Sequence, residues 1–166
     1  MSALDDVLSN GVSSGAAPGI VAMVGNAAGV KWSGAAGECA PGRPMRVDTV
    51  FRIFSMTKAV GSTAAMILID RGKLDMGATV ESILPEFSKI QVLDGFDGDM
   101  PRLRAPKSRA TIRQLATHTS GFAYEFWNPD VPRWMEKTGH PTILSGLKSS
   151  LFYPMVFDPG TRWDYG

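Results

Sequence analysis

Ser55 and Lys58 stand three residues apart in Ser55-Met-Thr-Lys58, where a predicted helix begins. This spacing puts both side chains on one helical face, with Cβ atoms about 5–6 Å apart, so the lysine amine can reach the serine hydroxyl. Serine is a weak nucleophile unless a base takes its proton. A lysine can be that base if burial lowers its pKa by disfavouring the charged form. The pair therefore indicates nucleophilic catalysis by Ser55 with Lys58 as activating base.

A plainer interpretation is that Ser55 caps the helix and Lys58 extends into solvent, and the tetrapeptide alone favours it. However, a cation in the first turn opposes the helix dipole, and helices normally carry Asp or Glu there. Residues that break a local rule tend to mark functional sites. The position of Lys58 therefore favours the catalytic interpretation.

Three other matches to catalytic motifs are predicted to be accidental. No strand leads into the second Ser-x-x-Lys and no long helix follows it. The Gly-x-Ser-x-Gly match lies at the end of a helix, where an esterase elbow needs a strand before it. The Lys-Thr-Gly match is better explained by a glycine that ends a helix. The three are Ser145-Gly-Leu-Lys148, Gly11-Val-Ser-Ser-Gly15 and Lys137-Thr-Gly139.

The first elements of the chain are predicted to be a helix followed by a hairpin. Ser2 and Asp5 resemble a capping box, and the apolar residues that follow share one helical face. The runs 19–25 and 30–36 are strand-like and flank a short turn, which is typical of an antiparallel hairpin. Residues 37–47 are rich in Gly and Pro and are expected to form a loop.

A long helix is predicted to follow Ser55. Residues 48–54 form a short extended segment that leads directly into it, and Gly72 is a natural stop after residues 56–71. The helix is apolar on almost every side, so we expect it to be buried. Thr111 and Gln114 form a second capping-box pair that opens a short helix. The stretch 94–109 is polar and rich in Gly, Asp, Pro and Arg, and the chain after the first hairpin is predicted to be mostly helical.

Composition places the chain among ordinary globular proteins. It has 166 residues, of which 44% are hydrophobic and 20% charged, and its net charge is +1. This near balance gives no sign of a nucleic-acid or membrane partner. Cys39 is the only cysteine, so an internal disulfide is excluded. The start of the chain lacks the pattern of a secretory leader, and we expect a soluble cytoplasmic protein.

Beyond the Ser55 motif, an ordered series of segments resembles class C β-lactamases and the related family VIII carboxylesterases and acyltransferases. The similarity runs from about residue 15 to the last residue, and the order of the motifs is more specific than any one of them. The segments are Phe51-Arg-Ile-Phe-Ser-Met-Thr-Lys58, Arg71-Gly-Lys-Leu-Asp75, Leu84-Pro85, Leu115-Ala-Thr-His-Thr-Ser-Gly121 and Asp158-Pro-Gly-Thr-Arg-Trp-Asp-Tyr165.

The resemblance implies an α+β fold of the β-lactamase and penicillin-binding-protein type, with an antiparallel sheet flanked by helices and a helical subdomain. Residues 1–54 would supply a helix and the first strands, and residues 55–166 the nucleophile helix and most of the helical subdomain. The resemblance also assigns an acyl-enzyme to Ser55 and proton transfer to Lys58 and Tyr165. A neighbouring ammonium would lower the tyrosine's usual pKa of about 10 toward that of a useful base.

Family members continue for roughly as long again after the tyrosine motif. The missing half would carry the remaining strands, the third motif and one of two oxyanion-hole donors, the other being the Ser55 N–H. Losing one donor costs about 100- to 1,000-fold in rate. We therefore expect activity only with a C-terminal remainder, on this chain or on a second one.

The expected reaction is hydrolysis or acyl transfer of a small-molecule ester, without cofactor or metal. The lack of a Tyr-Ser-Asn triplet and an aromatic-rich segment after Gly121 favour esters over β-lactams or D-Ala-D-Ala peptides. An alternative of another class is a catalytically silent scaffold of the same fold. His118 and His140 are given no catalytic role. Candidate wall residues of the acyl pocket are Tyr124, Phe126, Trp127 and Trp163.

Overall fold

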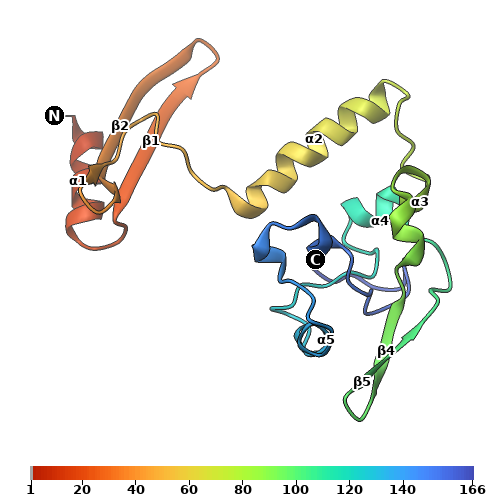
Figure 1. The fold of residues 1–166 in the computed structure, drawn as a ribbon. Helices are drawn as coiled ribbons and strands as arrows, with labels where there is room; N and C mark the ends of the chain where they lie inside the picture. Colours follow the sequence, from red (N-terminus) through yellow and green to blue (C-terminus); the bar gives the residue numbers. More distant parts are fainter. Residues whose placement is uncertain (1) are drawn as a thin grey trace. The chain divides into compact units, whose positions relative to one another are not determined.

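The computed structural model describes residues 2–166, and the chain divides into two compact units. The first unit ends at Ser55, and the second comprises Met56–Gly166. Figure 1 traces both along the chain. None of the helices within residues 2–166 has the length and hydropathy that a bilayer span requires.

Helix α1 (Ala3–Ser13) opens the first unit and begins with the predicted capping box. The Asp5 carboxylate accepts a hydrogen bond from the Ser2 N–H at 2.7 Å, and the Ser2 hydroxyl accepts one from the Asp5 N–H at 3.3 Å. The two bonds satisfy N–H groups that have no partner inside a helix. Leu8 is buried, and α1 packs against the strands that follow it (Figure 1).

The predicted hairpin is confirmed. Strand β1 (Gly19–Asn26) pairs antiparallel with β2 (Gly29–Ala40), with Ile20 opposite Ala36 and Val24 opposite Trp32. The turn falls on Ala27 and Ala28, within the short segment that separates the two apolar runs. The register shifts between Val24 and Gly25, just before the turn.

The loop predicted over residues 37–47 is wrong in part. Strand β2 continues to Ala40 and pairs with β3 (Arg43–Pro44), so the sheet has the order β1-β2-β3. Gly37 permits the continuation because it adopts a φ of 78°, and a Cβ there would lie 2.2 Å from the Pro18 carbonyl oxygen. Glycine fits such a close approach because it has no side chain.

Helix α2 (Thr57–Asp70) opens the second unit and ends just before Gly72, as predicted. The expectation that it is buried is wrong: no α2 residue is buried, and Ile67 and Leu68 are 44% and 41% exposed. A helix that is apolar on every side needs neighbours on every side. The described elements of its own unit leave each α2 residue at least partly accessible.

Two short helices follow α2 and are tied together by their backbones. The N–H of Val80 in α3 (Val80–Ile83) donates to the Ala110 carbonyl at 2.8 Å, just before α4 (Ile112–Ala116). The predicted capping box of α4 is confirmed, with Thr111 and Gln114 exchanging backbone-to-side-chain hydrogen bonds. Figure 1 shows α3 and α4 side by side.

The polar stretch over 94–109 contains most of a second hairpin, so the prediction of mostly helices after the first hairpin is wrong in this part of the chain. Strand β4 (Val92–Asp97) pairs antiparallel with β5 (Met100–Arg104). Polar, turn-forming residues obscured the alternating pattern that is typical of strands. Tertiary packing decides that this segment forms a hairpin. Leu93 enters a buried cluster with α5 (Asp130–Thr138) and Tyr153; the cluster comprises Leu93, Val131, Trp134, Met135 and Tyr153. Full burial of each such side chain contributes about 1.5–3 kcal/mol.

A charged pair anchors the segment that leads to Tyr165. The Arg104 guanidinium donates to both Asp158 carboxylate oxygens, at 2.8 and 2.9 Å, and the Lys107 N–H adds a third bond at 2.9 Å. The Asp158 side chain is only 9% exposed. These partners lower the pKa of Asp158 to about 2, chiefly through the Arg104 hydrogen bonds.

We expect Asp158→Asn to lower the Tm by several degrees at pH 7, because Arg104 loses the closer and less exposed of its two carboxylate partners and keeps only Asp94, at 3.4 Å. The folded-state pKa lies below the unfolded value of 3.8, so this stabilisation is present above pH 3.8 and is lost as the pH falls through about 2. Thermal unfolding followed by circular dichroism, at pH 7 and near pH 2, measures the difference in Tm between the wild type and Asp158→Asn.

Asp48→Asn is the matched control for Asp158→Asn. Asp48 pairs with Arg46 at 3.1 Å, but both side chains are more than 70% exposed, and such surface pairs contribute little to stability. Equal Tm values for Asp158→Asn and Asp48→Asn at pH 7 would contradict the anchoring role of the Arg104 pair.

Candidate functional site

Ser55 follows a residue with an unusual backbone. The single turn Phe54–Met56 leads into α2, and Phe54 has a φ of 43°, in the left-handed region. Such a conformation costs a non-glycine residue about 1–3 kcal/mol, and strained residues of this kind concentrate at functional sites. The Phe54 side chain is 70% exposed, so its packing does not offset this cost.

The plainer interpretation of the Ser55 motif is wrong in both of its parts. The N-cap of α2 is Met56, and no side chain makes a capping hydrogen bond there, so Ser55 is not the cap. The Lys58 amine does not extend into bulk solvent, because it lies at hydrogen-bond distance from two phenol groups.

Lys58 lies between two tyrosines that are far from it in the sequence. Its Nζ is 3.0 Å from the hydroxyl of Tyr124 and 3.0 Å from the hydroxyl of Tyr165. The same nitrogen is 5.2 and 4.6 Å from the two ring centroids. The structure therefore joins two predicted catalytic residues, Lys58 and Tyr165. It adds Tyr124, which the sequence indicated only as a pocket wall.

The charge state expected for Lys58 is wrong. Burial is the largest single effect and lowers its pKa, as anticipated. Hydrogen bonds to Tyr165 and Tyr124, together with attraction to their phenol groups, outweigh burial and raise the pKa of Lys58 above its usual range. At neutral pH the side chain is therefore an ammonium, which donates to the two hydroxyl oxygens.

The two tyrosines are held together by their backbones as well as by Lys58. The Tyr124 N–H donates to the Tyr165 carbonyl at 2.9 Å, and the Asp164 N–H donates to the His118 carbonyl at 3.0 Å. Segments 118–124 and 158–165 thus lie alongside each other. Their pairing fixes the 5.3 Å separation and 62° angle of the two rings.

His118 makes local contacts beside Tyr165. It follows the end of α4, has a φ of 56° and donates its N–H to the Leu115 carbonyl at 3.3 Å. Its ring lies 4.8 Å from that of Tyr165. Within residues 2–166, Phe54 and His118 are the non-glycine residues with positive φ, and both lie next to a candidate site residue.

The other predicted substrate-binding residues are exposed and adjoin the two tyrosines. Phe126 is 55% exposed with its ring 5.9 Å from that of Tyr124, and Trp163 is 63% exposed and stacks 6.5 Å from Tyr165. Trp127 is 69% exposed, and its N–H donates to the Tyr124 carbonyl at 3.0 Å. All three therefore lie close in the chain or in space to the phenol groups that contact Lys58.

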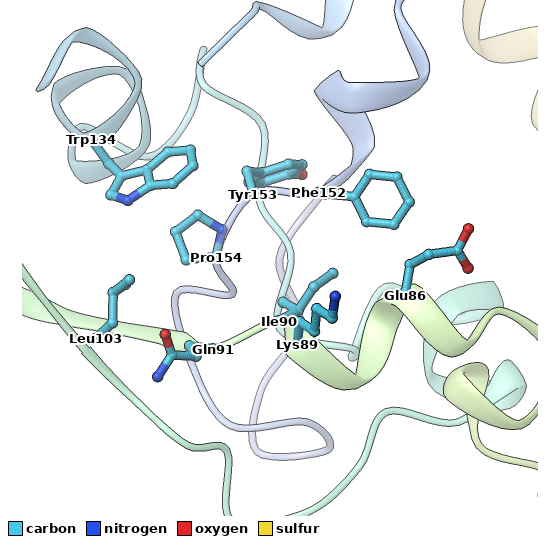
Figure 2. Close-up of a pocket in the computed structure, with 9 residues that line it drawn as sticks. All are labelled: Glu86, Lys89, Ile90, Gln91, Leu103, Trp134, Phe152, Tyr153 and Pro154. Carbon is cyan, nitrogen blue, oxygen red and sulfur yellow. The ribbon is translucent and has the colours of Figure 1, made fainter. Parts of the chain in front are cut away.

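Some cavities in the second unit are lined by Lys58 or Tyr124, and another is not. Lys58 lines one of about 350 Å³, and Tyr124 lines another of about 290 Å³ with mostly apolar walls. Figure 2 shows a third cavity, of about 310 Å³, between Trp134, Tyr153 and Gln91. Neither Lys58 nor the Tyr124–Tyr165 pair lines the third cavity, so it is not part of the candidate site.

Two of the three motif matches that were predicted to be accidental make structural contacts. The Ser145 hydroxyl accepts from the Leu147 N–H, and Lys148 pairs with Glu86 at 3.2 Å. Gly139 is the left-handed C-cap of α5, as predicted for the Lys-Thr-Gly match. Within the described part of the chain, no three His, Cys, Asp or Glu residues are grouped so that they could hold a metal ion.

Comparison with known proteins identifies similar sequences and folds. A family model described as Beta-lactamase matches residues 4–166. Acyltransferase mokF of Monascus pilosus is 39% identical over 132 residues, which are 78% of this chain and 32% of the relative. Lovastatin esterase of Penicillium rubens is 35% identical over 127 residues, 75% of this chain and 32% of the relative.

Among solved structures, unliganded simvastatin synthase (LovD) from Aspergillus terreus superposes with a TM-score of 0.80 at 33% identity, covering 98% of this chain and 44% of that one. The predicted α+β, β-lactamase-like fold class is thereby confirmed. The chain spans about a third of the length of the curated relatives it matches.

Proposed function

Because this chain belongs to the Beta-lactamase family, we propose that it carries the nucleophile region of a serine hydrolase or acyltransferase that acts on carboxylic esters through an acyl-enzyme. The observation that carries the proposal is the Lys58 amine held between two phenol hydroxyls, three residues after Ser55. Relatives named as an acyltransferase and an esterase support esters as the substrate class.

In the proposed first step, Tyr165 enters as a phenolate: the Ser55 oxygen forms a bond to the ester carbonyl carbon, the carbonyl double bond opens onto its oxygen, and the serine proton passes to the phenolate oxygen. The carbon–oxygen bond to the alcohol then breaks, and the alcohol leaves with that proton. Lys58 acts as a cation that stabilises the phenolate form of Tyr165 by Coulomb attraction. This role replaces the neutral lysine base expected from the sequence, because the pKa of Lys58 is raised.

In the second step, water or another alcohol attacks the acyl carbon and gives its proton to Tyr165. The bond to Ser55 breaks, and the proton returns to the serine oxygen. Which acceptor attacks decides between hydrolysis and acyl transfer. We assign contact with the apolar part of the substrate to Phe126, Trp127 and Trp163, since exposed aromatic side chains beside a reactive group favour apolar ligands.

The relatives extend well beyond the matched segment, and we propose that activity needs the corresponding elements, on the same polypeptide or on a second one. Those elements would supply the second oxyanion donor, with the Ser55 N–H as the first. Both units of this chain would then belong to one domain of the complete fold.

Reaction with a fluorophosphonate probe, followed by peptide mapping, tests the proposal on the full-length protein. The probe is expected to add to one residue, Ser55, and prior incubation with a short-chain nitrophenyl ester is expected to slow the reaction. Intact mass in the same experiment distinguishes one polypeptide from two. Labelling at Ser145 or at no serine would contradict the assignment, and the second result would favour a catalytically silent scaffold.

Hydrolysis of a chromogenic cephalosporin in a parallel assay addresses the alternative that the family description raises, a β-lactamase. We expect turnover of the nitrophenyl ester to exceed turnover of the lactam. The reverse order would replace the ester with an amide as the substrate class, while leaving Ser55 as the nucleophile.

A further inference from the structure

Tyr124 makes the same contact with Lys58 as the proposed catalytic tyrosine does. Both hydroxyl oxygens lie 3.0 Å from Nζ, and the two rings meet at 62° with their centroids 5.3 Å apart. The amine therefore lies in the angle between two phenol groups. A lysine side chain has four rotatable carbon bonds, and a single acceptor does not fix its direction.

Tyr124 is itself held rigidly at the backbone. Its N–H donates to the Tyr165 carbonyl at 2.9 Å, and its carbonyl accepts from the N–H groups of Trp127 and Asn128 at 3.0 and 3.1 Å. Both backbone polar groups are therefore engaged. A side chain on a fixed backbone provides a fixed hydrogen-bond acceptor, and this is the requirement for holding a flexible partner in place.

An ammonium has three donors and no acceptor, so it accommodates two phenol oxygens at once. With the Tyr124 hydroxyl in place, one N–H is directed away from Tyr165 while another stays on it. Without that hydroxyl, the amine can rotate to water and the charged form loses a partner. The structure thus gives Tyr124 a second possible task besides lining the neighbouring cavity.

We propose that Tyr124 is a positioning residue: its hydroxyl holds the Lys58 ammonium against Tyr165, and it acts on the reaction only through Lys58. The catalytic consequence rests on the proposed function, whereas the positioning of the amine does not. The two statements therefore need separate measurements.

Tyr124→Phe is the direct test, because it removes one oxygen and keeps the ring. We expect kcat for a nitrophenyl ester to fall on the order of tenfold, since hydrogen bonds to charged groups are among the stronger ones. KM is expected to stay within about twofold, because the ring that faces the neighbouring cavity is retained. A raised KM with an unchanged kcat would assign Tyr124 to substrate contact and overturn the proposal.

Tyr153→Phe is the matched control. The sequence has three tyrosines, and Tyr153 is the one that remains besides Tyr124 and the proposed catalytic Tyr165. Tyr153 is only 9% exposed and packs in the cluster with Trp134, and burial raises the pKa of its phenol. It is expected to keep wild-type kcat. Equal kcat values for the two variants, with unchanged circular dichroism, would overturn the proposal.

Competitive acetylation with acetic anhydride, quantified by peptide mass spectrometry, measures the amine without requiring activity. Lys148 serves as the internal reference because its side chain is 72% exposed. Lys58 is expected to react more slowly than Lys148 in the wild type and severalfold faster in Tyr124→Phe, with no change in Tyr153→Phe.

The two readouts separate the two possible failures. Faster acetylation of Lys58 in Tyr124→Phe, in a protein that hydrolyses no ester, would refute the proposed function and leave the positioning of Lys58 supported. Unchanged acetylation in an active enzyme would refute the positioning role alone.

Discussion

Ser55→Ala is expected to reduce ester hydrolysis by about 10⁴- to 10⁶-fold in kcat, to a level set by any residual binding and polarisation of the substrate. The reason is chemical: alanine has no oxygen, so no acyl-enzyme can form. KM is expected to change little, because the methyl group of alanine occupies less space than the serine side chain. Steady-state hydrolysis and fluorophosphonate labelling of the full-length protein measure both quantities.

Ser145→Ala provides a control with the same local motif. Ser145 also precedes a lysine by three residues, but its hydroxyl accepts from the Leu147 N–H and Lys148 pairs with Glu86. This variant is expected to retain wild-type kcat and labelling. Loss of activity in Ser145→Ala with activity retained in Ser55→Ala would make Ser145 the nucleophile and contradict the assignment of Ser55.

Lys58→Met is expected to lower kcat by about 1,000-fold, because Tyr165 loses the cation that stabilises its phenolate, and loss of a positioned acid–base group costs about 100- to 10,000-fold. Methionine keeps a similar length and is a good helix former, so α2 is preserved. What is lost is the ammonium that donates to Tyr124 and Tyr165. Single-turnover kinetics should show that both acylation and deacylation slow, because Tyr165 takes a proton in each step.

The same variant has a pH signature in stability. The folded-state pKa of Lys58 lies above its ordinary value of 10.5, so its stabilising contribution is complete below pH 10.5 and is lost as the pH rises through the folded-state value. The difference in Tm between wild type and Lys58→Met should therefore be constant at neutral pH and shrink in strong alkali. A difference that grows with pH would contradict the raised pKa.

Lys148→Met is the matched control for Lys58→Met. The Lys148 side chain is 72% exposed and its ion pair with Glu86 lies at the surface. Surface pairs contribute little to stability, so neither kcat nor Tm is expected to change appreciably. A loss of kcat equal to that of Lys58→Met would show that the effect does not come from the tyrosine contacts.

Local rules in the sequence predicted the elements whose determinants are themselves local. The capping boxes at Ser2 and Thr111 depend on residues three positions apart, and both form as expected. Gly72 ends α2 because a left-handed residue is needed there. The resemblance to class C β-lactamases, and not a local rule, assigned proton transfer to Lys58 and Tyr165 together, and the structure holds the two in contact although they are 107 residues apart.

The features that sequence reasoning missed depend on contacts between distant segments. Strands β4 and β5 look like a polar loop until Leu93 is buried against α5. The raised pKa of Lys58 depends on two phenol oxygens acting together, whereas burial alone predicted the opposite direction. Tyr124 carried no motif of its own, and its role follows only from its hydrogen bond to Lys58.

The left-handed Phe54 has a consequence for protein engineering. Glycine there would remove a cost of about 1–3 kcal/mol from the folded chain. It would also raise the entropy of the unfolded chain, which opposes folding by roughly 1 kcal/mol. The exchange could thus yield a more heat-tolerant protein, since the exposed phenylalanine has little packing to lose. Glycine would also make the backbone next to Ser55 more flexible. A screen for thermostability alone would therefore favour variants with lower catalytic activity.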